Sequence, residues 1–238
     1  MTHCFSRRSF LKGSAAAAAA LTSPLLPADA AFSETENGLF SPVSALCQTQ
    51  YGPVKGREGE NGQLCWYGIP YGAAPTGESR WTAPQEPACW HIVRDCTSPA
   101  PAAYQYTTFP LGTEDCLTLD IYSSAEAKKR PVLVYLHGSA ATGSSLELPG
   151  SELVRDAGCV FVALNYRLGL FGWNCLPALT ADPDATGNFA LLDIARALDW
   201  MRDNIRRFGG DAKKAFAEPF YKPKADGTPG PLVRKVKT

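Results

Sequence analysis

The chain has 238 residues, of which 45% are hydrophobic and 19% charged, a composition typical of a globular protein with room for a sizeable core. Its 23 Lys and Arg residues balance its 23 Asp and Glu residues, and the sequence pI is about 6.8. This balance excludes recruitment of a partner by overall charge, so we expect neither a nucleic acid nor an anionic membrane as partner.

The N-terminus has the order of elements typical of a twin-arginine export signal. Arg7 and Arg8 lie within the pattern Ser6–Lys12. A weakly apolar stretch follows at Gly13–Leu26, and Ala28–Asp29–Ala30 provides small residues for cleavage. The apolar stretch is shorter than the roughly 20 residues of a membrane span. We therefore expect the twin-arginine export machinery of a bacterium as a partner and a periplasmic or secreted product; a disordered basic N-terminus is the alternative.

Cysteine usage agrees with an oxidising compartment. Cys4 falls in the predicted signal peptide, and none of the seven cysteines after it has Cys-x-x-Cys spacing. Only His91 and His137 remain as imidazole ligands, so we expect no zinc site and no other metal or cofactor. Disulfides are expected, although the odd number leaves at least one thiol unpaired or bridged to another chain.

Hydrophobic patterns predict an α/β fold. Leu64–Tyr67 reads as a strand, and alternation over Leu117–Ile121 predicts a half-exposed strand. Two continuous apolar runs, Pro131–Leu136 and Cys159–Leu164, are typical of strands buried on both faces. Because Ser151–Ala157 between them fits a short crossover helix, the two strands should lie parallel in one sheet.

A longer amphipathic helix is predicted after the second buried strand. Its apolar face repeats at helical spacing from Leu191 to Ile205, with charged residues opposite. Asn188 is the predicted N-cap, and Gly209–Gly210 ends the helix.

Seven short motifs, taken in chain order, resemble the type B carboxylesterase family. They are Tyr67–Tyr71, Pro75–Trp81, Glu114–Ile121, Pro131–Gly138, Asn165–Gly169, Gly187–Asp193 and Phe208–Asp211. The resemblance implies a partial α/β-hydrolase fold: the N-terminal strands and the start of the parallel sheet, truncated before the nucleophile turn. It also implies hydrolysis of a small-molecule ester by a serine, a histidine base and an acid, with backbone N–H groups that bind the oxyanion.

The residues that perform this chemistry are not in the sequence. It contains no Gly-x-Ser-x-Gly turn, and the family's acid and histidine belong to sequence that this chain does not include. His137 matches a loop-shaping position before the oxyanion glycines and does not replace the base, and His91 is interpreted as a solvated histidine. We therefore expect no catalytic residue here and no triad-dependent turnover.

The resemblance places the oxyanion loop at Gly138, Ser139 and Ala140. The family has a run of glycines at this point, because backbone N–H groups must approach the substrate closely. Ser139 and Ala140 keep their N–H groups, but their Cβ atoms crowd the site and a positive φ is costly. We expect poor ester hydrolysis even from an intact chain of this type.

The resemblance also makes Cys116 a half-cystine. Its usual partner position corresponds to Ala103, so Cys89 or Cys96 is the predicted partner. The segment between Ala103 and Cys116 contains no Trp, which disfavours a cholinesterase specificity.

The composition changes after Asp211. From there to Thr238 the chain has seven Lys or Arg residues against three Asp or Glu, a net charge of +4. Lys214–Lys222 resembles a C-terminal segment of type II-C CRISPR RNA-guided nucleases, and Leu232–Lys237 resembles the strand after it. No nuclease active-site residue accompanies them, so we interpret the segment as a solvated basic tail.

These observations predict three regions: a signal peptide (1–30), a partial carboxylesterase domain (31–211) and an unrelated tail (212–238), joined as a chimera. Three functions remain open. The chain is a carboxylic ester hydrolase by family resemblance that is inactive as given, a non-catalytic binding module, or a non-functional truncated or chimeric product. An incomplete sheet should leave an unpaired strand edge beside Val160–Leu164.

Overall fold

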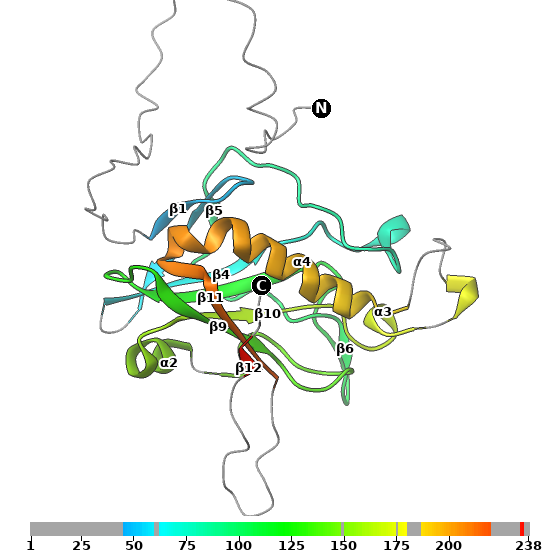
Figure 1. Cartoon of the computed structure of the whole chain (residues 1–238). Helices are drawn as coiled ribbons and strands as arrows, with labels where there is room; N and C mark the ends of the chain where they lie inside the picture. The colour runs from blue at the N-terminus through cyan, green and yellow to red at the C-terminus, as the bar shows by residue number, and fades with distance from the viewer. Residues whose placement is uncertain are drawn as a thin grey trace, which may run out of the picture. The chain divides into compact units, whose positions relative to one another are not determined.

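The computed structural model describes residues 45–59, 62–148, 150–174, 176–179, 187–219 and 234–235. The predicted signal peptide, including Arg7 and Arg8, lies outside these residues. A mixed seven-stranded sheet dominates the described part (Figure 1). In spatial order its strands are β12 (Arg234–Lys235), β11 (Gly210–Pro219), β9 (Arg130–Leu136), β10 (Val160–Leu164), β8 (Thr118–Ser124), β4 (Gln63–Pro70) and β3 (Arg57–Glu58).

The parallel centre of this sheet confirms the sequence prediction. β9 pairs in parallel with both β10 and β11, whereas the remaining neighbours pair antiparallel. The crossover from β9 to β10 contains helix α2 (Gly150–Ala157), which ends at Gly158 in the left-handed region with φ 60°. Only glycine adopts that conformation without a steric cost, so Gly158 stops the helix as expected.

The predicted amphipathic helix is also present. It is α4 (Phe189–Asn204), followed by a 3₁₀ turn, η4 (Ile205–Phe208), and by Gly209 with φ 85°. Asn188 occupies the N-cap position, as predicted, and its carbonyl accepts from the Leu191 and Leu192 N–H groups, but its side chain makes no capping hydrogen bond.

The two helices cover opposite faces of the sheet. Residues of β10 alternate, so that Val160 and Val162 belong to the same core cluster as Trp200 of α4. Phe161 belongs to a second cluster with Val154 of α2. This alternation is what a strand buried on both faces requires, and it makes β10 the centre of the fold.

Two expectations about neighbouring strands are wrong. β8 is buried along both faces rather than half-exposed, because it lies between β4 and β10 instead of at an edge. For the same reason Val160–Leu164 has no unpaired edge: β8 and β9 bond to its two sides.

The segment after Asp211 continues the sheet instead of departing from it. β11 runs through Asp211 and pairs with β9 from Ala215–Val132 to Pro219–Leu136, after a register shift. The three-residue run Ala212–Lys214 does not show the apolar pattern of a buried strand, which is why the sequence did not indicate one.

Shorter elements surround the main sheet. A three-stranded sheet has the order β1 (Leu46–Gln48), β2 (Pro53–Lys55) and β5 (Arg94–Asp95), and a hairpin joins β6 (Gln105–Tyr106) to β7 (Pro110–Leu111). The remaining short helices are η2 (Gly77–Ser79), α3 (Gly169–Gly172) and η3 (Pro177–Leu179). In the described ranges, no helix is both long and apolar enough to span a membrane.

The predicted disulfide from Cys116 to Cys89 or Cys96 is not formed, since Cys116 and Cys96 are both free, buried thiols. The Tyr67 N–H donates to the Cys96 carbonyl, whereas the residue after Cys116 accepts from the Tyr71 N–H. The backbone at Cys96 is therefore held by Tyr67 within β4, and the backbone after Cys116 by Tyr71, just beyond that strand.

Candidate functional site

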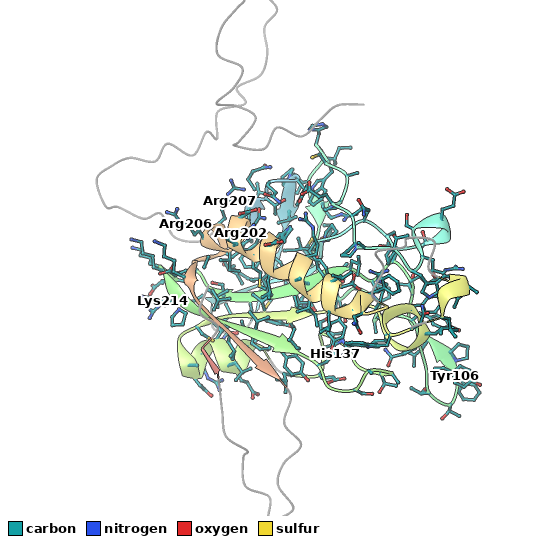
Figure 2. The ribbon with its side chains drawn as sticks, turned by 45° about the vertical axis from the view of Figure 1, so that its right-hand side comes forward. Tyr106, His137, Arg202, Arg206, Arg207 and Lys214 are labelled. Atoms are coloured by element: carbon teal, nitrogen blue, oxygen red, sulfur yellow. The ribbon has the colours of Figure 1, made fainter. Side chains whose placement is uncertain are left out.

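The predicted oxyanion loop follows β9, at the carboxyl end of the parallel strands. His137 begins it, and Figure 2 labels that residue. Open α/β sheets bind ligands at this edge, because the loops that leave parallel strands meet there.

His137 anchors the start of the loop from inside. Its side chain is buried and stacks on the ring of Tyr166, with centroids 4.2 Å apart and an interplanar angle of 5°. The Tyr166 hydroxyl donates a 2.6 Å hydrogen bond to the His137 carbonyl. Burial lowers the pKa of His137 below its ordinary value of 6.5, which favours the neutral ring.

Ser139 has the positive φ that the sequence analysis treated as costly, at 71°. Its Oγ accepts hydrogen bonds from the N–H groups of Ala141 (3.2 Å) and Thr142 (3.3 Å), which fixes this turn locally. The Gly169 N–H donates to the Ala140 carbonyl at 2.7 Å, which holds the turn at Ala140.

The N–H groups of Ser139 and Ala140 remain available. Both residues are exposed, and the hydrogen bonds between described residues include none donated by either N–H. Two adjacent N–H groups without an acceptor among the described residues, on a loop held at both ends, are the kind of pair that can bind a negatively charged oxygen.

The far end of the loop is held by an amide from β6. The Gln105 side chain donates to the Gly143 carbonyl at 2.9 Å and accepts from the Gly143 N–H at 3.0 Å. Gly143 is required here, because a Cβ atom would lie 2.2 Å from His137 Nδ1. Gln105 therefore fixes Gly143 against the ring that anchors the start of the loop.

A buried polar network completes the support. Ser145 donates from Oγ to Asp120 Oδ2 at 2.6 Å, and its N–H donates to the Asn165 side-chain oxygen at 2.9 Å. The second Asp120 oxygen accepts from the Gly68 N–H at 2.7 Å. Burial raises the pKa of Asp120, and the hydrogen bonds from Ser145 and Gly68 oppose this shift.

A buried ion pair supports the segment behind the loop. The Arg167 guanidinium binds Asp193 of α4 through two hydrogen bonds of 2.8 and 2.6 Å, and the Arg167 N–H adds a third at 3.1 Å. Its remaining arm donates to the Thr82 carbonyl at 2.9 Å. Because both charges are buried, this two-pronged ion pair fixes the segment Tyr166–Gly169. That segment contacts the loop at two points: the Tyr166 hydroxyl bonds to the His137 carbonyl, and the Gly169 N–H bonds to the Ala140 carbonyl.

The structure thus brings His137, Gly138, Ser139 and Ala140 together, and places His91 elsewhere, on an exposed surface. Cys116 lies apart from the loop and lines a cavity of about 10 Å³, which has room for no more than a water molecule. Among the described residues, no group of three or more His, Cys, Asp or Glu is placed to hold a metal ion.

The supporting residues were missed by the sequence analysis. They are Gln105, Asp120, Ser145, Asn165 and Tyr166. Asp120, Asn165 and Tyr166 lie in the motifs that carry the family resemblance, which marks the positions without assigning them a role. Asp120 also stands out as a charged residue between Leu119 and Ile121 in an apolar strand, where an unpaired carboxylate would be costly.

The sheet order, the crossover and the loop with free N–H groups after β9 define the N-terminal part of an α/β hydrolase. The match to solved structures agrees: a PNB esterase superposes with a TM-score of 0.68 at 39% identity, covering 73% of this chain and 37% of the esterase. A carboxylesterase from Geobacillus stearothermophilus gives 0.68 at 36% identity, covering 74% and 37%.

The chain belongs to the carboxylesterase family, whose model matches residues 43–215. It is 41% identical over 178 residues to para-nitrobenzyl esterase of Bacillus subtilis (strain 168), covering 70% of this chain and 36% of that protein. It is 36% identical over 179 residues to fumonisin B1 esterase of Sphingopyxis macrogoltabida, covering 70% and 33%. The chain therefore spans about a third of the length of these relatives.

A separate match identifies residues 4–24 as a twin-arginine translocation signal sequence, which indicates export by that pathway. The comparisons give no support to the resemblance of Lys214–Lys222 to RNA-guided nucleases. The family match extends four residues beyond Asp211, so it includes the start of the predicted tail; the domain boundary at that residue stays a prediction.

Proposed function

We propose that this chain provides the oxyanion-binding part of an exported carboxylesterase, and that the 238-residue chain does not itself hydrolyse esters through a serine triad. The observation that carries the proposal is the pair of exposed residues Ser139 and Ala140, whose N–H groups have no acceptor among the described residues, on a loop held at both ends. The substrate class is a carboxylic ester, by membership of the family.

The lack of turnover follows from chemistry. Oxyanion donors stabilise charge only after a nucleophile has attacked the carbonyl, and the sequence has no Gly-x-Ser-x-Gly turn to supply one. A fluorophosphonate probe, which labels activated serines covalently, should leave the purified chain unlabelled. Stoichiometric labelling would contradict this half of the proposal.

The donor role is tested by transplanting the loop. Residues His137–Ser145 would replace the corresponding loop of para-nitrobenzyl esterase, and p-nitrophenyl ester hydrolysis would be measured. We expect the graft to hydrolyse the ester measurably, though more slowly than the parent esterase because Ser139 and Ala140 replace glycines, and an Ala140→Pro change, which deletes one N–H donor, to lower kcat by a further factor of about 10² to 10³.

Ala141→Pro is the matched control in the graft. It makes the same type of backbone change one residue later, but the N–H that it removes already donates to Ser139 Oγ, whereas that of Ala140 has no acceptor among the described residues. We expect a much smaller loss of kcat from this control. Equal losses at the two positions would show that loop shape, not donation from Ala140, matters.

A further inference from the structure

The described surface carries an apolar feature that the proposed oxyanion loop does not use. The hairpin formed by β6 and β7, which we call the aromatic hairpin (Tyr104–Leu111), exposes 68% of Tyr106 and 73% of Phe109. Leu111 on the same hairpin is also exposed. Exposed aromatic residues gathered on one projecting element are typical of a contact surface.

The aromatic hairpin lies in an uncharged part of the chain. From Thr97 to Thr113 the sequence has no Asp, Glu, Lys or Arg. Transfer of this segment into an apolar phase therefore involves no desolvation of a charged side chain. Tyr side chains also suit the boundary between water and lipid, because they are apolar with a polar tip.

The backbone of the aromatic hairpin is suited to the same environment. Residues Gln105–Leu111 and Tyr106–Pro110 pair across the two strands. In the turn, the Thr107 N–H donates to the Phe109 carbonyl at 3.2 Å. Pro110 has no N–H, so it adds no unpaired donor. The Thr108 and Phe109 N–H groups have no acceptor among the described residues, so the turn suits the boundary between water and lipid, where water still pairs with them, rather than the hydrocarbon interior.

Two other partners for the aromatic hairpin, a second copy of this chain and an anionic membrane, fit less well. The exposed area of three or four side chains is well below the roughly 800 Å² that each partner contributes to a standard protein interface, so a second copy of this chain would not be held firmly. An anionic membrane would favour a cluster of unpaired basic residues, but Arg206 and Lys214 lie on the other side of the described part from Tyr106 (Figure 2). Arg80 is nearer, because it packs over Phe171 beside Tyr104, but it is paired with Glu114.

We propose that the aromatic hairpin docks this protein on the surface of a neutral lipid layer. Gln105 of β6 binds both polar groups of Gly143, so a docked hairpin would lie beside the oxyanion loop. A docked protein would then receive water-insoluble esters from the lipid at that loop. This consequence rests on the proposed function, whereas the docking itself is independent of it.

The test is flotation of the full chain with large phosphatidylcholine vesicles, in which the bound fraction is measured at low and high salt. We expect salt-independent binding that falls by about tenfold or more in the double variant Tyr106→Ser with Phe109→Ser. A second double variant, Tyr106→Ser with Phe109→Trp, should recover binding, since Trp favours the interface. Circular dichroism would verify that each variant keeps its fold.

Ile92→Ser is the matched control. Ile92 is 85% exposed, but Arg94 and Asp95 follow it, so insertion there would bury charges. This variant should bind like the unchanged chain. Three outcomes would overturn the proposal: no binding to neutral vesicles, equal binding by the double serine variant, and binding that requires anionic lipid and disappears in salt. Since every variant keeps residues 1–44, equal binding would assign the contact to another part of the chain.

Discussion

The two halves of the proposed oxyanion loop are built in different ways. The first half, Gly138–Ala140, is exposed at Ser139 and Ala140, has Ser139 at positive φ, and has N–H groups without acceptors among the described residues. The second half, Gly143–Ser145, is held by Gln105 of β6, Asp120 of β8 and Asn165, the residue after β10. The rigid second half holds the loop in place, while the first half is free to present its N–H donors. A site preorganised in this way need not rearrange during a reaction.

The largest expected effect comes from breaking the ion pair behind the loop. Asp193→Ala leaves the buried Arg167 guanidinium without its partner, and we expect the free energy of unfolding to fall by about 3–5 kcal/mol. Urea denaturation measures it. Asp199→Ala is the control, because its ion pair with Arg202 on the same helix is half-exposed and should contribute about 0.5 kcal/mol or less. Similar losses in the two variants would refute a special role for the buried pair.

The second half of the loop should be sensitive to Ser145. Ser145→Ala leaves one oxygen of Asp120 and the Asn165 amide without this partner in a buried site, and we expect a loss of about 1.5–3 kcal/mol in unfolding free energy. Its neighbour Ser144 is partly exposed, and Ser144→Ala should change stability by about 0.5 kcal/mol or less. A small effect at both serines would mean that the polar network does not hold the loop.

The first half should respond to backbone strain instead. Ser139→Ala loses the two hydrogen bonds to Oγ while keeping a Cβ at positive φ, whereas Ser139→Gly loses the same bonds and removes the steric cost. We expect the glycine variant to be more stable than the alanine variant by about 1 kcal/mol in thermal denaturation. Equal stabilities would show that the positive φ costs nothing here.

The smallest effect is a pH dependence from His137. The pKa of His137 is lower in the folded chain than its ordinary value of 6.5. At a pH between the folded-state pKa and 6.5, the unfolded chain therefore binds the proton more readily than the folded chain does. The unfolding free energy should therefore decrease as pH falls below about 6.5, and His137→Gln should flatten that part of the profile. Asp120 contributes with the opposite sign at lower pH, because its pKa is raised: its contribution decreases as pH rises above 3.8. An unchanged slope in His137→Gln would contradict the burial argument.

The sequence predicts the regions whose pattern is local. Continuous apolar runs identified β9 and β10, and helical spacing identified α4, because each pattern reflects burial of the element itself. β11 was missed, since its basic start lacks that pattern, and the burial of β8 depends on neighbours that are distant in the chain. The loop itself was predicted from its motif, but its support was not. Gln105 lies 38 residues before Gly143, and nothing in either sequence neighbourhood indicates that an amide of one binds the backbone of the other.

The most direct test of this account is amide hydrogen exchange along residues 137–146, measured residue by residue on the purified chain. The account predicts that the N–H groups of Ser139 and Ala140 exchange near their intrinsic rates, whereas those of Gly143 and Ser145 are protected by Gln105 and Asn165. Protection of Ser139 and Ala140 equal to that of Gly143 and Ser145 would contradict it, because the two donors would then already be occupied.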